Sequence, residues 1–225
     1  MNFLELCEEF CALSSIPRAP TSVVGNTGEL DRVARWIRQS WTDIQLKHTT
    51  WKFLMKDLSF TTTTSQGPYT LAEMGASDLQ ELDLNTLRCY QTSVGVSSEQ
   101  FLVYWEYDIF RDTYLYANPM PASRPTVFTV DPADKSVILA PLPSSDGWTV
   151  RGKYWRKPVT LAADADIPAC PDQFHMAIVH RALMKYAGYE AAQEVKQTAV
   201  EEYKTLMAAL EHDQLDALQF GEPLA

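Results

Sequence analysis

The hydrophobic pattern of this chain changes twice along its length, from a helical period to a strand-like alternation and back. Residues 2–14 repeat large apolar side chains at spacings of three and four, which predicts an amphipathic helix. A second helix is predicted from Thr27, its expected N-cap, to about His48. Acidic residues lie in its first turn, and Lys47 and His48 lie in its last, as the helix dipole favours.

The helical period returns after Pro171. Residues 172–186 are apolar around much of the helix they would form, so we expect this helix to be central in the fold. Gly188 is expected to end it, because glycine readily adopts the backbone conformation that terminates helices. Residues 190–213 form the last predicted helix, which would pair with the preceding one as an antiparallel hairpin.

The middle of the chain is rich in β-branched residues and turn-forming residues. Residues 58–71 predict one hairpin and residues 125–139 another, the latter around a turn at Asp131–Lys135. A short helix is predicted at residues 107–116, with Asp108 as its cap. Further strands are predicted at residues 87–91, 100–104 and 148–155.

Together these elements predict an α+β fold, a helical bundle built from N- and C-terminal helices with an inserted antiparallel β-rich domain. We expect residues 1–50 and 168–213 to form the helical core and residues 51–167 to form the inserted domain. Residues 214–225 contain a glycine and a proline, so we expect them to form an extended C-terminal arm.

This arm contains the candidate binding residues of the chain. Four apolar side chains on an extended end suggest a segment that docks on a neighbouring protein, although a frayed terminus would have the same composition. The four candidate partner-binding residues are Leu215, Leu218, Phe220 and Leu224.

Composition narrows the range of partners. The chain has 29 acidic and 19 basic residues, for a formal net charge of −10. Affinity for nucleic acid comes largely from Lys and Arg side chains that displace counterions from phosphate, so we do not expect this chain to bind DNA directly. An acidic surface could still border DNA, because repulsion would keep the DNA from sticking.

The chain shows no sign of export or membrane insertion. Its first residues lack a basic segment, and no apolar run approaches the roughly 20 residues that a membrane span needs. We therefore expect folding in a reducing cytoplasm, where cysteines stay free. Cys7 and Cys11 would then be buried apolar side chains rather than a metal or redox pair.

No motif in the sequence indicates catalysis, a metal or a cofactor. Nucleophile elbows, phosphate loops, zinc motifs and dinucleotide fingerprints are all missing. His175 and His180 would point about 140° apart on a helix, so they cannot share a metal from one face. The carboxylate pair in the 131–135 turn suits turn geometry, and the pair Asp164 and Asp166 lies in a loop that we expect to be solvated.

Several stretches, spread over residues 3–215, resemble one known family when they are taken together. They are Thr27–Leu30 with Trp36, Ile37 and Trp41, Gln100–Leu102 with Tyr107–Tyr114, Arg124-Pro125, Tyr154–Leu161, and Ile167-Pro168 with Phe174–Leu183. In these stretches the chain resembles the phage adaptor family, also called head–tail connector or head completion proteins.

The resemblance implies a non-enzymatic virion protein of a tailed bacteriophage. Such a protein would form a homo-oligomeric ring, a dodecamer, between the portal and the tail or nozzle proteins, with DNA passing through the lumen without specific binding. It would be assembled in the host cytoplasm and would serve tail assembly and genome ejection. A ring needs the same heterologous contact on every subunit, and the 25 aromatic residues could supply apolar surface for it.

Two alternatives stay open at this point. One is a tail-completion or neck protein that makes no contact with the portal. The other is a small hydrolase of unrecognised type that acts through Asp or Glu, which would require a compact cleft around a carboxylate.

Overall fold

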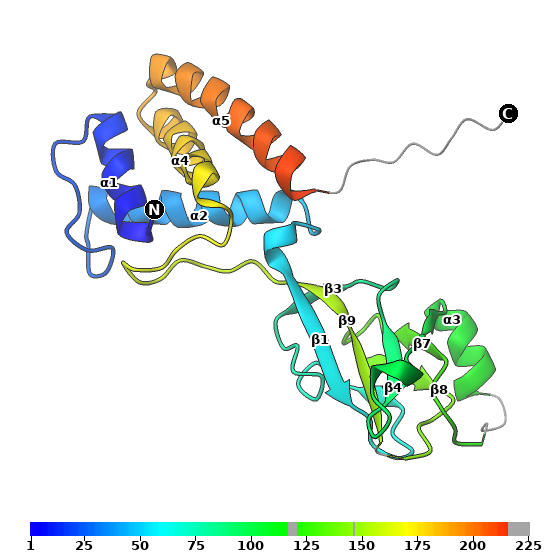
Figure 1. The fold of residues 1–225 in the computed structure, drawn as a ribbon. Helices are drawn as coiled ribbons and strands as arrows, with labels where there is room; N and C mark the ends of the chain where they lie inside the picture. The colour runs from blue at the N-terminus through cyan, green and yellow to red at the C-terminus, as the bar shows by residue number, and fades with distance from the viewer. Residues whose placement is uncertain (117–120, 146, 216–225) are drawn as a thin grey trace, which may run out of the picture. The chain divides into compact units, whose positions relative to one another are not determined.

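We describe a computed structural model of the 225-residue chain over residues 1–116, 121–145 and 147–215 (Figure 1). The chain forms two compact units, which are described separately below. The helical unit comprises residues 1–54 together with the chain from Pro158 onward, and the β unit comprises residues 55–157. The predicted α+β class, with terminal helices and a central antiparallel-rich region, is confirmed.

The helical unit contains four long helices. They are α1 (Phe3–Ser14), α2 (Glu29–Lys47), α4 (His175–Tyr189) and α5 (Gln193–Gln214), with short 3-10 turns η1 (Lys52–Leu54) and η4 (Asp172–Phe174). Helix α1 starts with a capping box, in which Asn2 accepts from the Glu5 amide while the Glu5 carboxylate accepts from the Asn2 amide, both at 2.9 Å. Helices α1 and α2 both lie within the ranges that the sequence predicts, 2–14 and 27–48.

Helix α4 is the centre of this unit, as its all-round apolar sequence predicts. It packs against α1, α2 and α5, and seven of its side chains are buried. The core around it takes its large side chains from α1 and α2, on the predicted faces. They are Phe3, Leu6, Phe10, Val33, Ile37, Trp41 and Ile44.

Residues 158–167 belong to the helical unit, whereas the sequence analysis assigned them to the β-rich domain. The reason is that side chains of α2 hydrogen-bond to the backbone of this segment. The side chain of Gln45 accepts from the amide of Val159 at 2.8 Å and donates to its carbonyl at 3.0 Å. Arg38 donates to the carbonyl of Leu161 at 2.8 Å.

Two helix ends differ from the predictions. Helix α2 begins after Gly28, whose φ of 66° suits glycine, and no side chain caps it, so Thr27 is not the cap. Helix α4 continues through Gly188 to Tyr189, whose ring packs on Trp36 at a centroid distance of 5.8 Å. The chain turns instead at Ala191, with φ of 54°.

The β unit contains two sheets. The first has the order β1 (Met55–Thr61), β9 (Trp148–Arg156), β4 (Arg88–Gln91) and β5 (Gln100–Phe101), and β3 (Leu79–Leu82) also pairs with β9. The second has the order β2 (Pro68–Tyr69), β8 (Val137–Ala140), β7 (Val127–Val130) and β6 (Val103–Tyr104). A single buried core takes side chains from both sheets, including Leu58, Leu87, Val150, Phe128 and Leu139.

One predicted hairpin is correct and the other is wrong. Strands β7 and β8 form the expected hairpin, in which Asp131 accepts from the amide of Ala133 and Asp134 from the amide of Ser136, both at 2.8 Å. Residues 58–71 do not form a hairpin, because β1 pairs along its whole length with β9 while β2 pairs with β8. The nine-residue β9 offers β1 a longer ladder than the two-residue β2 could.

The predicted helix at residues 107–116 consists of two short turns. The α-helical turn α3 (Tyr107–Phe110) continues as a π-helical turn η3 (Arg111–Leu115). Its N-cap is Glu106 and no side chain caps it, so the expected role of Asp108 is wrong. Phe110 is buried against Val127 and Ile138 of the second sheet, which anchors the turn.

Candidate functional site: an ordered apolar edge of the β unit

One five-residue segment forms the edge of both sheets of the β unit. Gln100–Phe101 pairs antiparallel with β4 in the first sheet, and Val103–Tyr104 pairs parallel with β7 in the second. Leu102, between them, is buried and donates its amide to the carbonyl of Leu87 at 2.9 Å. The segment therefore crosses from one sheet to the other with its central side chain in the core.

The side chains on either side of Leu102 are apolar but exposed. Phe101 is 59% exposed, Val103 57% and Tyr104 39%, and the preceding loop exposes Val94 and Val96 at 55% and 58%. Exposed sheet edges present unpaired backbone groups that favour pairing with another chain, and proteins usually protect them with charged residues. Here the edge carries apolar side chains instead, which is typical of an interaction surface.

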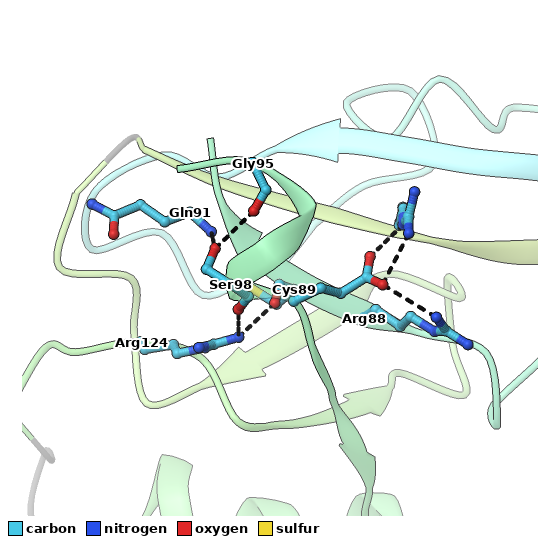
Figure 2. Close-up of polar contacts among 8 residues, drawn as sticks. Arg88, Cys89, Gln91, Gly95, Ser98 and Arg124 are labelled. Carbon is cyan, nitrogen blue, oxygen red and sulfur yellow. Dashed lines mark hydrogen bonds and ion pairs between the residues drawn. The ribbon is translucent and has the colours of Figure 1, made fainter. Parts of the chain in front are cut away.

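A network of polar contacts fixes the loop that leads into this edge (Figure 2). The Ser98 hydroxyl accepts from the amide of Gln91 at 3.0 Å and donates to the carbonyl of Gly95 at 2.9 Å. One guanidinium nitrogen of Arg124 donates to the carbonyls of Cys89 and Ser98, at 2.6 and 2.9 Å. These bonds tie residues 91–98 to β4 and to the segment before β7.

Glu99 adds an ion cluster directly before the edge. Its carboxylate accepts from Arg151 at 2.9 Å and from Arg88 at 3.1 Å. The bond to Arg151, together with that to Arg88, holds the pKa of Glu99 below its ordinary value. The Arg88 guanidinium also lies 4.2 Å from the ring centre of Phe101, so the exposed aromatic ring is supported from one side.

The cysteines are unsuited to nucleophilic chemistry. All four are free and buried. Burial raises the thiol pKa to about 12 for Cys7 and Cys170 and to about 11 for Cys11 and Cys89. These thiols are therefore protonated at neutral pH, which agrees with the prediction that Cys7 and Cys11 are buried apolar side chains.

The 162–166 loop is largely exposed, as expected, but its carboxylate pair also has a structural role. Asp164 accepts from the amide of Val23 at 2.6 Å and from the hydroxyl of Ser22 at 3.2 Å. Asp166 accepts from the amides of Ala162 and Ala163 at 2.6 and 2.8 Å, and these bonds lower its pKa. Both carboxylates hold backbone in place.

The contacts of His48 and His175 are structural, and the histidines do not form a metal site within the described residues. His48 bonds to Glu211 at 3.0 Å, and His175 bonds to the carbonyl of Cys170 at 3.0 Å. Burial lowers the pKa of both His175 and His180. Within residues 1–116, 121–145 and 147–215, no three His, Cys, Asp or Glu side chains are grouped to hold a metal ion.

A cavity of about 450 Å³ lies in the β unit between the second sheet and the α3–η3 turns. Phe110, Tyr114, Ile138 and Pro141 are among its lining residues. Both of its carboxylate residues are committed to other contacts. Asp131 accepts from the amide of Ala133 in the β7–β8 turn and from the hydroxyl of Tyr107, the latter at 3.3 Å, and Asp134 accepts from the amide of Ser136. The cavity therefore offers apolar volume without a free acid–base pair.

The predicted binding residues belong to the C-terminal end of the sequence and are not part of this edge. Leu215 directly follows α5, and its amide donates to the carbonyl of Glu211 at 3.0 Å. Leu218, Phe220 and Leu224 lie outside the described residues. Gln214, expected in the arm, is the last residue of α5 and accepts from the amide of Phe53 at 3.1 Å.

The sequence pattern predicts a strand at residues 100–104 but does not mark it as a binding surface. Alternation alone places Phe101 and Val103 on one side of a strand and Leu102 on the other, without showing which side is buried. The useful signal was that a short apolar strand follows a glycine- and serine-rich loop, 94–98.

Among the described helices, none is both long and apolar enough to cross a bilayer. A comparison with curated proteins finds no match. A comparison with protein families finds one described as SU10 adaptor protein, whose model matches residues 1–224. That match covers nearly the whole chain, so this protein belongs to the SU10 adaptor family of phage adaptor proteins, which are structural components of the virion.

Proposed function

We propose that this protein is the ring-forming subunit that joins the portal of a phage head to its tail. The ring, which we take to be a dodecamer, is assembled in the host cytoplasm and becomes part of the neck. DNA passes through its lumen during packaging and ejection without specific binding. The observation that carries this proposal is the family match over residues 1–224.

The charge of the chain supports a role beside DNA without affinity for it. The net charge is −10, and the part of the chain from Pro158 onward has eleven acidic and four basic residues, a net of −7. Acidic walls repel phosphate, so DNA could slide past them instead of being held.

The apolar edge supports contact with other protein chains. Phe101 and Val103 are more than half exposed, yet the loop beside them is fixed by Arg124 and Glu99. A surface that is ordered before binding loses little conformational entropy when a partner covers it. Such a surface suits repeated assembly of identical subunits.

The C-terminal residues supply a second contact in this proposal. Leu218, Phe220 and Leu224 follow Leu215 at the end of α5, and we assign residues 215–225 to attachment at the portal. Ten residues beyond Leu215 could span at most about 35 Å when extended, enough to reach a neighbouring protein.

Electron microscopy of the purified chain mixed with its portal ring tests the proposal. We expect a ring of this protein seated on the portal, and the same ring in the neck of intact virions. Cross-links to tail proteins with none to the portal would instead identify a tail-completion protein. A virion that is complete and infectious without this chain would overturn the adaptor assignment.

A further inference from the structure

We infer that β5 of one copy pairs with β1 of a second copy, so that the first sheet continues from subunit to subunit. The inference rests on the proposed ring and names the contact that would build it. The occupant of the apolar edge is then another copy of this chain.

The strand order of the first sheet leaves β1 and β5 at opposite ends. β9 pairs with β1 along residues 149–155. Its other side pairs with β4 along residues 148–151 and with β3 at residues 154–156. Within the described residues, β1 and β5 therefore each have one strand neighbour and one open side.

The strand directions fit a continued sheet. β1, β9, β4 and β5 alternate in direction, because every pairing between neighbours in this order is antiparallel. Because four strands alternate in direction, the first strand, β1, and the last strand, β5, run in opposite directions. A copy placed head to tail by rotation would thus set its β1 antiparallel to the β5 before it, which is the geometry that sheets favour.

The outward-facing backbone groups can be identified from the hydrogen bonds. The Leu102 amide donates to the Leu87 carbonyl, so Leu102 and Leu87 form a hydrogen-bonded pair. Since the pairs alternate along an antiparallel ladder, the next pair, Phe101 with Arg88, is not hydrogen-bonded. The backbone N–H and C=O groups of Phe101 therefore point away from β4, toward the open side of the sheet. The Thr62 amide bonds to the Trp148 carbonyl at 2.8 Å, which by the same alternation turns residues 57, 59 and 61 outward on β1.

The side chains are in phase with the backbone. Ser59, Arg151, Arg88 and Phe101 are register partners in one row across the four strands. If Phe101 pairs with Ser59 of the next copy, both place their backbone groups toward each other and their side chains on the same face. Shifts by two residues, to Asp57 or Thr61, keep this match, whereas shifts by one residue break it.

The two ends of the sheet are also opposite in charge. Residues 100–116, at the β5 end, contain three acidic residues and one basic residue, a net of −2. Strands β1 and β9 contain four basic residues and one acidic residue, a net of +3. Arg151 is committed to Glu99 and Lys56 to Asp78, which leaves a net of +1 to face −2. This complementarity favours head-to-tail contact over contact between two identical ends.

Cysteine cross-linking of the full-length chain tests the inference. All four native cysteines are buried, so introduced thiols on the surface can be oxidised selectively. Chains with Phe101→Cys are mixed with chains carrying Ser59→Cys and are assembled on the portal ring. We expect disulfide-linked dimers in the mixture but not in either variant alone. The double variant should give a ladder of multimers up to the closed ring.

The matched control replaces Ser59→Cys by Lys56→Cys, an exposed position of β1 that is out of phase with Phe101. This pair should not cross-link, and Asp57→Cys and Thr61→Cys cover the permitted two-residue shifts. Cross-linking of Phe101→Cys with itself would overturn the inference, because the contact would join identical edges. Rings seen by electron microscopy without any of these cross-links would overturn it while leaving the proposed function intact. If no ring forms and the portal is not bound, the proposed function fails and the inference fails with it.

Discussion

Gly152 of β9 lies directly against Leu87, the buried residue before β4. A Cβ atom at position 152 would come within 2.8 Å of the Leu87 Cδ1 atom and 3.4 Å of its Cα atom. Leu87 is fully buried and its carbonyl accepts the bond from Leu102 that fixes the apolar edge. A small residue at position 152 therefore allows the core beneath the edge to close.

Replacing this glycine should weaken the β unit. Gly152→Ala forces the Leu87 side chain to move within a packed core, and overpacking of this kind costs about 1–3 kcal/mol of unfolding free energy. Calorimetry should show a lower Tm for the transition of the β unit. The control is Gly188→Ala in α4, where a Cβ meets no atom within 4 Å. That change should be neutral or stabilising by about 0.5–1 kcal/mol, and equal losses for both variants would contradict the packing argument.

Arg124 should control the order of the loop beside the edge. In Arg124→Met, the carbonyls of Cys89 and Ser98 lose a charged donor, which costs about 1–3 kcal/mol. Hydrogen exchange of the amides of residues 98–104 should become faster by at least tenfold. The control is Arg111→Met, whose ion pairs are with the exposed Asp108 and Asp112. Unchanged exchange in Arg124→Met would show that the loop is held by other contacts.

Glu99 should give the β unit a dependence on acid pH. Its pKa is lowered in the folded protein relative to an ordinary value of 4.5, mainly by the bond to Arg151. The folded state then binds the proton less readily than the unfolded state. The stabilisation is therefore fully present above about pH 4.5 and is lost as pH falls through the folded-state pKa.

Denaturant unfolding from pH 7 to pH 3 measures this effect. The stability of Glu99→Gln should decline less over the acid range than that of the unmodified protein. Arg151→Met removes the main cause of the lowered Glu99 pKa, so it should flatten the dependence of stability on pH in the same way. Combining Glu99→Gln with Arg151→Met should change that dependence little further. Parallel profiles for Glu99→Gln and the unmodified protein would exclude this carboxylate as the source.

The parts of the fold that depend on local periodicity could be predicted from the sequence. The apolar faces of α1 and α2 and the all-round apolar α4 each specify a helix without reference to distant residues. The β7–β8 hairpin is equally local, because Asp131 and Asp134 fix its turn.

The parts that depend on long-range pairing could not be predicted. β1 pairs with β9, whose partner residues lie 88 to 100 positions later in the chain, because β9 is the longest strand available. No short-range signal in the sequence shows this pairing. The same limit hid the apolar edge, since the exposure of Phe101 follows from where β4 and β7 lie. Helix ends were missed where tertiary contacts decide them, as at Tyr189 on Trp36.

The C-terminal residues should be needed for attachment to the portal but not for folding. Deletion of residues 216–225 keeps α5 complete, including Gln214, which accepts from the Phe53 amide. The truncated chain should therefore keep the circular dichroism spectrum and Tm of the full chain.

Its affinity for the portal should fall on the order of 100-fold, because three apolar side chains that anchor an interface contribute roughly 1 kcal/mol or more each. The triple variant Leu218→Ala, Phe220→Ala, Leu224→Ala should lose the same affinity in a portal-binding assay. The matched control, Asp216→Asn with Glu222→Gln, keeps the apolar residues and should bind normally. If the control loses binding while the triple variant keeps it, the contact is electrostatic. If the truncated chain binds the portal normally, the C-terminal residues take no part in attachment.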